Sequence, residues 1–216
     1  MIMISKEDQD YCLVMEMAIK LFVFDMGNVL IEERHVWPAV FRKFGIDVKN
    51  IRDLGPNATS AIQRMLVSDM DEQEFWNMVE LDMQKCVEWK GILSDSYTCM
   101  ELPGTRAVIG QLLANGNRVV CGTNNIRPFY EKIKAGGYYD TFQRTYSSFK
   151  IGLSKPDPEF WKYIADKEGV RLDEMFFTDD LSRNIEAAKS LGIKTHLFTN
   201  AECLANALND IPTMDT

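Results

Sequence analysis

Short apolar runs recur along this chain, and helical patterns lie between them. Runs rich in β-branched and aromatic residues occupy positions 20–25, 118–122, 144–147, 175–178 and 194–198. Strands that are buried on both faces of a parallel sheet have continuous apolar sequences of this kind. Their alternation with helical patterns predicts βαβ units, and therefore an α/β fold with a parallel sheet between two layers of helices.

The helical patterns carry start and stop signals. The segment "PGTRAVIGQLLANGN" places Val108, Leu112 and Leu113 on one side of a helix and ends at Gly116. The segment "DPEFWKYIADKEG" begins with a proline and ends at Gly169, and "SRNIEAAKSLG" also ends with glycine. Proline in the first turn and glycine just after the last turn are typical helix boundaries, so we expect a helix in each segment.

One interval departs from the alternation. About 75 residues separate the first apolar run from the helix near residue 104, whereas a βα connection is usually about 2 to 6 residues long. The interval has helical patterns near 36–45, 58–68 and 72–86. We therefore expect a helical insert at residues 34–100, directly after the first strand. The core would then comprise residues 19–33 and 101–216, and residues 1–18 would form an N-terminal extension.

Composition and charge exclude several classes of protein. The 216 residues are 46% hydrophobic, which suffices for one full-sized core. The net charge is −8 and the basic residues form no stripe, which argues against a nucleic-acid partner. The five cysteines have no metal or redox spacing, and no apolar stretch approaches the roughly 20 residues needed to span a bilayer. We expect a soluble cytoplasmic protein, monomeric or homodimeric, without a membrane partner.

Polar residues follow four of the apolar runs, three times directly and once in the next loop. The carboxyl ends of parallel strands share one edge of the sheet, where ligands bind in open α/β folds. The residues at these ends are Asp25 after the first run, Thr123 and Asn124 after the second, Lys155 in the loop after the third, and Asp179 and Asp180 after the fourth. We expect them to converge on one point.

Such a group of side chains suits phosphoryl transfer. Carboxylates from two strands can hold a hard divalent cation such as Mg²⁺, and either this cation or Lys155 must offset their repulsion. An aspartate can attack phosphorus and form an acyl-phosphate. Thr123 and Lys155 could donate to the phosphoryl oxygens. Asn125 and Arg127 are further candidate phosphate contacts.

Four segments in order, "FVFDMGNVL", "VVCGTNN", "SKPDPEF" and "FFTDDLSRNIEAAKSLGI", resemble the four motifs of the haloacid dehalogenase-like superfamily. The likeness extends from about residue 19 to residue 200. It implies a hydrolase with a Rossmann-like core and a helical cap inserted after the first motif. It also implies that Asp25 is the nucleophile, Thr123 the phosphate-binding hydroxyl and Lys155 the motif lysine.

The same resemblance implies a metal site, and the position of three further residues suggests a substrate site. Asp25, the backbone carbonyl of Gly27 and Asp180 would ligate Mg²⁺, and Asp179 would act directly or through water. Among the residues that follow the second strand, those expected to contact a small phosphorylated metabolite are Asn124, Asn125 and Arg127.

Gly27 departs from the pattern of most phosphatases in the superfamily. They have an aspartate two residues after the nucleophile, which protonates the leaving alcohol, and its loss would cost roughly 10²- to 10⁴-fold in rate. A branch that resembles bacterial glucose-1-phosphatases also reads D-x-G-N-V here. This favours a Mg²⁺-dependent phosphatase that acts on sugar phosphates through an aspartyl-phosphate. Water or a cap residue would supply the proton, and His35 at the entry to the cap is a candidate.

Three other functions fit part of the pattern. Haloacid dehalogenases also lack the second aspartate and need no Mg²⁺, but Asp179 and Asp180 would then be surplus. A pseudoenzyme could bind phosphorylated metabolites without turnover. A signalling receiver domain uses similar Asp, Thr and Lys chemistry, but it resembles this chain in the reverse order, since its acidic pair precedes the phosphorylated aspartate.

Overall fold

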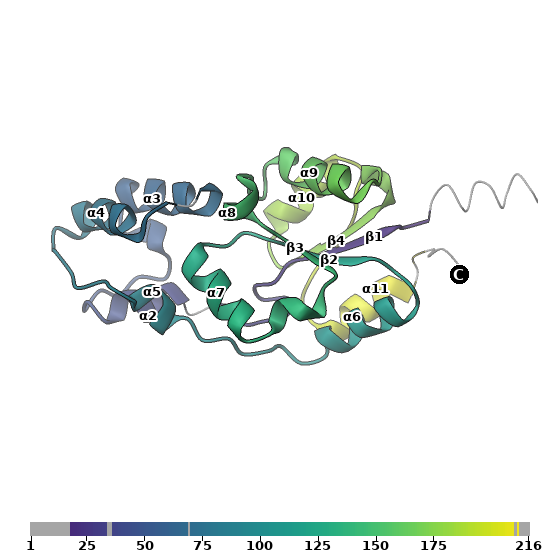
Figure 1. The fold of residues 1–216 in the computed structure, drawn as a ribbon, viewed down its shortest axis with the longest axis horizontal. Coiled ribbons are helices and arrows are strands. Elements are labelled where there is room, and N and C mark those ends of the chain that lie inside the picture. The colour runs from purple at the N-terminus through teal and green to yellow at the C-terminus, as the bar shows by residue number, and fades with distance from the viewer. Residues whose placement is uncertain (1–17, 34–35, 69, 210, 212–216) are drawn as a thin grey trace, which may run out of the picture.

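Five parallel strands form one sheet at the centre of the computed structural model, which describes residues 18–33, 36–68, 70–209 and 211 (Figure 1). Their order across the sheet is β3-β2-β1-β4-β5. The strands are β1 (Leu21–Phe24), β2 (Val119–Thr123), β3 (Arg144–Ser147), β4 (Met175–Asp179) and β5 (Lys194–Leu197). The chain builds the sheet outward on both sides of β1, so the strand order reverses at β1 and the ligand crevice is expected at its carboxyl end.

Helices cover both faces of the sheet, as Figure 1 shows. Alternate residues of β1 point to opposite faces: Leu21 and Val23 belong to one buried apolar cluster, and Phe22 and Phe24 belong to the other. The first cluster includes side chains of α9 (Pro158–Glu168) and α10 (Ser182–Ser190), and the second includes side chains of α6 (Thr105–Ala114), α7 (Arg127–Ala135) and α11 (Ala201–Asn209). The predicted three-layer α/β fold is therefore confirmed.

The residues that were predicted to begin and end a helix do so in the structure, as α9 shows. Asp157 accepts a hydrogen bond from the Glu159 backbone N–H (3.0 Å) at the start of α9, and Gly169 ends this helix with a φ of 64°. The remaining elements within the described ranges are short. They are α8 (Ser148–Ile151) and the 3-10 turns Ile51–Asp53, Tyr138–Thr141 and Leu172–Glu174.

The interval between β1 and α6 is helical, as expected, and gathers at one end of the molecule (Figure 1). It contains α2 (Val36–Arg42), α3 (Pro56–Val67), α4 (Glu72–Met83) and α5 (Ile92–Ser96). Two parts of this interval pack on α7 through aromatic contacts: the ring centroid of Phe129 lies 5.6 Å from that of Trp37 in α2 and 4.6 Å from that of Tyr97, which follows α5. The insert and one face of the core thus share a continuous apolar cluster.

The two ends of the insert meet. The Glu32 backbone N–H donates to the Met100 carbonyl (2.9 Å), and the Leu102 N–H donates to the Leu30 carbonyl (2.8 Å). This pairing supports the division of the chain near residues 33 and 101, which stays a prediction. Except for Ala18, the expected N-terminal extension lies outside the described residues, and so does His35. No helix within the described ranges is long and apolar enough to cross a membrane.

Candidate active site

Three carboxylates converge at the carboxyl end of the sheet. Asp25 directly follows β1, Asp179 ends β4 and Asp180 is the next residue, and their oxygens lie within 4.8 Å of one another. A cavity of about 510 Å³ opens beside them between the sheet and the inserted helices. Asp25 and Asp180 line this cavity, whereas Asp179 is fully buried.

Lys155 joins two of the carboxylates. Its Nζ lies 2.9 Å from Asp25 Oδ1 and 2.7 Å from Asp179 Oδ2, and 1% of its side chain is exposed. Asn124 holds the lysine loop in place, because its side-chain amide donates to the Lys155 carbonyl (2.8 Å) and accepts from the Lys155 backbone N–H (2.9 Å). The loops after β2 and β3 therefore position the lysine against the ends of β1 and β4.

Burial and crowding of like charges perturb these groups. Burial, together with the charges of Asp179 and Asp180, raises the pKa of Asp25 to about 8, although Lys155 opposes the shift. Burial and Asp179 also raise the pKa of Asp180. Burial alone would lower the pKa of Lys155, but the facing carboxylates of Asp179 and Asp25 raise it. Three acids and one lysine leave excess negative charge that a cation can neutralise.

The oxygen donors suit a hard divalent ion. Asp179 is the most fully bonded of the three acids: its oxygens accept from Lys155, from the Leu181 backbone N–H (2.9 Å) and from Asn184 Nδ2 (2.9 and 3.0 Å). It therefore suits an indirect role through water better than direct ligation. Asp25, Asp180 and the Gly27 carbonyl remain the predicted direct ligands.

The structure brings some predicted substrate residues to the cavity and leaves others away from it. Asn124 and Asn125 line the cavity, but the Asn125 side chain accepts from the Ile126 backbone N–H (2.8 Å) and donates to the Tyr139 hydroxyl (3.3 Å). Thr123 ends β2 and is buried, but it is not among the described residues that line the cavity. Arg127 lines a second, separate cavity.

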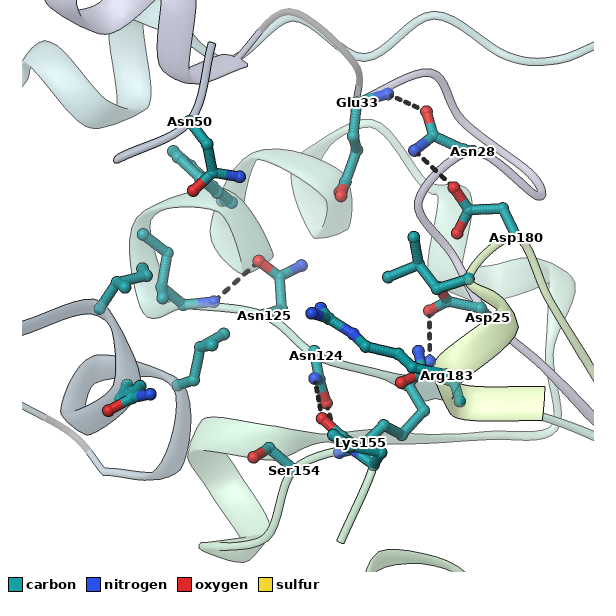
Figure 2. Close-up of a pocket in the computed structure, with 18 of the residues that line it drawn as sticks. Asp25, Asn28, Glu33, Asn50, Asn124, Asn125, Ser154, Lys155, Asp180 and Arg183 are labelled. Carbon is teal, nitrogen blue, oxygen red and sulfur yellow. Dashed lines mark hydrogen bonds and ion pairs between the residues drawn. The ribbon is translucent and has the colours of Figure 1, made fainter. Parts of the chain in front are cut away.

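Two arginines that the sequence patterns did not single out line the main cavity. Arg183, near the start of α10, extends into the cavity in Figure 2, and Arg52 comes from the insert. Burial and the charge of Arg183 lower the pKa of Arg52, which indicates that two like charges lie close together. Two guanidinium groups on one cavity wall can bind anionic groups. The pair forms only when the insert packs against the core, so the sequence patterns do not reveal it.

Asn28 and Glu33 are also unforeseen members of the site. Asn28 has a φ of 53°, and its Nδ2 donates to Asp180 Oδ2 (3.0 Å) while its Oδ1 accepts from the Glu33 backbone N–H (3.0 Å), as Figure 2 shows. The Glu33 carboxyl faces the cavity, and its Oε1 accepts a hydrogen bond from the Tyr97 hydroxyl. Burial raises the pKa of Glu33 to about 7.

Comparisons with known proteins agree with this chemistry. The sequence profile of the haloacid dehalogenase-like hydrolases matches residues 19–192. D-ribitol-5-phosphate phosphatase of Bacteroides thetaiotaomicron is 26% identical over 192 residues, which are 82% of this chain and 90% of that protein. Drimenol cyclase drtB of Aspergillus calidoustus is 31% identical over 101 residues. That match covers 45% of this chain and 19% of the cyclase.

Solved structures share the fold. An enzyme of the HAD family from Bacteroides thetaiotaomicron, in complex with magnesium and inorganic phosphate, superposes with a TM-score of 0.68 at 23% identity, over 85% of this chain and 96% of that one. L-2-haloacid dehalogenase from Xanthobacter autotrophicus, with chloropropionic acid covalently bound, has a TM-score of 0.62 at 16% identity, over 88% of this chain and 82% of that one. At these identities the similarity concerns the fold alone.

Proposed function

The chain belongs to the haloacid dehalogenase-like hydrolases, and we propose that it is a Mg²⁺-dependent phosphatase of small phosphorylated metabolites, with sugar phosphates preferred. The observation that carries this proposal is the convergence of Asp25, Asp179, Asp180 and Lys155 beside a cavity. A nucleophilic carboxylate, an acidic cluster and a buried lysine are the components that transfer of a phosphoryl group to an aspartate requires.

Asp25 is the proposed nucleophile. Its Oδ1 accepts from the Met26 backbone N–H (2.8 Å) and from Lys155 Nζ, so the carboxylate has a defined orientation before substrate arrives. In the first step an oxygen of Asp25 bonds to phosphorus while the bond from phosphorus to the leaving alcohol breaks. Water then attacks the aspartyl-phosphate, releases inorganic phosphate and regenerates Asp25.

The residues present fit a magnesium ion. Asp25, Asp180 and the Gly27 carbonyl would hold it, and Asp179 would act through water while it keeps Lys155 in place. When bound, Mg²⁺ would offset the charge of the carboxylates and of the incoming phosphate. Lys155 would donate to a phosphoryl oxygen as charge develops there.

The cavity wall supports a polar substrate. The inserted segment contributes Asn50, Arg52 and Gln63, and the core contributes Asn124 and Arg183. Amide and guanidinium groups can bind hydroxyl and phosphate oxygens. The D-ribitol-5-phosphate phosphatase relative also supports a sugar phosphate or a polyol phosphate as substrate.

A screen of phosphate esters tests the proposal. Sugar phosphates, nucleotides and p-nitrophenyl phosphate are incubated with the protein in Mg²⁺ or in EDTA, and released phosphate is measured. We expect turnover in Mg²⁺ alone, and we expect Asp25→Asn to reduce turnover to background while its thermal unfolding stays cooperative. Asp166→Asn changes a carboxylate with an exposed side chain on α9, so it serves as the matched control with full activity.

Other outcomes would overturn the proposal. Activity retained by Asp25→Asn would remove the proposed nucleophile. Release of chloride from 2-chloropropionate without Mg²⁺, with no phosphate ester turned over, would identify a dehalogenase instead. Mg²⁺-dependent binding of a phosphate ester without product would identify a binding protein that lacks turnover.

A further inference from the structure

The space beside Gly27 is filled by Glu33. A Cβ atom at residue 27 would lie 2.3 Å from Glu33 Oε2 and 2.6 Å from its Cδ, closer than non-bonded atoms approach. Gly27 is not among the residues with positive φ, so its backbone conformation does not itself demand glycine. A side chain at residue 27 would instead displace the Glu33 carboxyl, which occupies the place where that side chain would begin.

We propose that Glu33 is the general acid of the reaction, and that its carboxyl replaces the aspartate that most phosphatases of this family have at the position of Gly27. This inference rests on the proposed phosphatase function. It is carried by the location of Glu33 Oε2, which lies where that aspartate side chain would start, on the wall of the cavity that Asp25 also lines. A carboxyl group delivered from residue 33 thus reaches the same part of the cavity wall from which a side chain at residue 27 would extend.

The chain holds Glu33 in this place from two sides. The left-handed turn at Asn28 folds the backbone back, so that the Asn28 N–H donates to the Ile31 carbonyl (2.6 Å) and Asn28 Oδ1 accepts from the Glu33 N–H (3.0 Å). From the far end of the insert, the buried Tyr97 hydroxyl donates to Glu33 Oε1. Figure 2 shows the resulting direction of the Glu33 carboxyl, into the cavity and on the same side as Asn28 and Asp180.

Tyr97 also determines which oxygen can transfer a proton. Burial and the neighbouring Glu33 carboxyl raise the pKa of Tyr97, so its hydroxyl keeps its proton and acts as a donor to Oε1. The transferable proton therefore belongs on Oε2, the oxygen next to Gly27. After transfer, the hydrogen bond from Tyr97 stabilises the Glu33 carboxylate.

The proposed steps balance. In the first step, the proton moves from Glu33 Oε2 to the ester oxygen while an Asp25 oxygen bonds to phosphorus and the bond between phosphorus and the ester oxygen breaks. In the second, the Glu33 carboxylate takes a proton from water while the water oxygen bonds to phosphorus and the bond to Asp25 breaks. The products are the alcohol and inorganic phosphate, and both side chains return to their starting states.

A comparison of leaving groups tests the role of Glu33. General acid catalysis typically contributes about 10²- to 10⁴-fold for a poor leaving group. We expect Glu33→Gln to lower kcat/KM for an alkyl phosphate, such as glycerol 3-phosphate or a sugar phosphate that the wild type turns over, by about 10²-fold or more. Its effect on p-nitrophenyl phosphate, whose leaving group needs no proton, should be less than about 10-fold. Glu32→Gln, the adjacent carboxyl, is the matched control and should leave both substrates unaffected.

A second pair of variants tests the exchange of positions directly. Glu33→Ala removes both the acid and the steric conflict at residue 27, and we expect the same selective loss on alkyl phosphates. Adding Gly27→Asp to Glu33→Ala should restore at least about 10-fold of the lost kcat/KM, because it delivers a carboxyl from the position used by most relatives. Gly27→Asp in the presence of Glu33 should not improve activity, because the two side chains compete for one space.

The outcomes separate the two proposals. An equal loss on alkyl and aryl substrates in Glu33→Gln, with unchanged thermal unfolding, would assign Glu33 a positioning role and overturn the inference. Failure of the double variant to recover activity, while it folds as stably as Glu33→Ala, would overturn it as well. A wild-type protein that turns over no phosphate ester in Mg²⁺ would overturn the proposed function, and the role of Glu33 with it.

Discussion

A substitution of Lys155 is the strongest test of the charge arrangement in the candidate active site. Its side chain is 1% exposed, and its Nζ pairs with the carboxylates of Asp25 and Asp179. Lys155→Met keeps an unbranched apolar chain and removes the charge. Breaking a buried ion pair usually costs about 3 to 5 kcal/mol, because the remaining partner stays buried without its counter-charge. Here the loss has an upper limit, because a stranded carboxylate can take up a proton.

The limit can be worked out from the reference pKa of aspartate, about 3.9. Protonating one carboxyl at pH 7 costs about 1.4 kcal/mol for each of roughly three pH units, or about 4 kcal/mol. At pH 5 the cost falls to about 1.5 kcal/mol. Asp25, with a folded-state pKa of about 8, already holds a proton at pH 7 in EDTA, so the substitution leaves a single buried charge without its partner, that of the Asp179 carboxylate. We expect a loss of about 3 to 4 kcal/mol at pH 7, which lowers Tm by roughly 10 °C in a chain of this size.

Urea and thermal unfolding at pH 7 and pH 5, in EDTA, measure this loss. Lys162→Met is the matched control, because Lys162 pairs with Glu159 at 2.8 Å on the exposed surface and its loss should cost less than about 1 kcal/mol. A loss in Lys155→Met no larger than in Lys162→Met would contradict the assigned ion pairs. A loss of equal size at both pH values would show that packing, and not charge, explains the effect.

Two further results are expected. Because the folded-state pKa of Asp25 is about 8 and its ordinary value is 3.8, the folded protein binds a proton that the unfolded chain releases between these pH values. The contribution of Asp25 to the free energy of unfolding in EDTA should therefore fall as pH rises from 4 to 8, by up to about 1.4 kcal/mol per unit. Glu33, with a pKa raised to about 7, adds a fall of the same sign. Mg²⁺ should reduce the fall, and a rise in EDTA would contradict the shift of Asp25. Arg183→Gln should raise KM for sugar phosphates about 10-fold with a smaller change in kcat, whereas Arg144→Gln, on the exposed surface, should not; an unchanged KM would exclude Arg183 from substrate binding.

The sheet could be predicted because parallel strands that are buried on both faces have continuous apolar sequences. All five apolar runs form strands, with boundaries that agree to within one residue at each end. The helices α2, α3 and α4 were also expected, whereas α5 was not, because its five residues are too few to establish a helical period. The sequence pattern thus predicts elements whose burial repeats over many residues.

The same reasoning explains which parts of the site were found. Asp25, Asp180 and Lys155 follow strands, and the topology of a parallel sheet brings strand ends together whatever the loops do. Arg52 and Arg183 reach the cavity from an insert turn and a helix start, so only the packing of the insert against the core unites them. Arg127 is a different case, because its closeness to Asn124 in sequence suggested a phosphate contact, whereas in the structure it lines a separate cavity.

Gly27 and Glu33 illustrate how a side chain that is missing from a sequence motif can be replaced in the site by a residue from another position. In the sequence, Gly27 stands where most phosphatases of the family have an acid, two residues after the nucleophile. In the structure, the Asn28 turn returns the chain and places the Glu33 carboxyl 2.3 Å from where a Cβ of residue 27 would be. Since both cannot occupy that space, glycine at 27 and glutamate at 33 form one arrangement: the glycine makes room for the acid. A comparison of the motif residue by residue finds that the acid at position 27 is missing, but it does not find Glu33. The turn at Asn28 brings Glu33 to this place, and a turn of this kind leaves no fixed spacing in the motif.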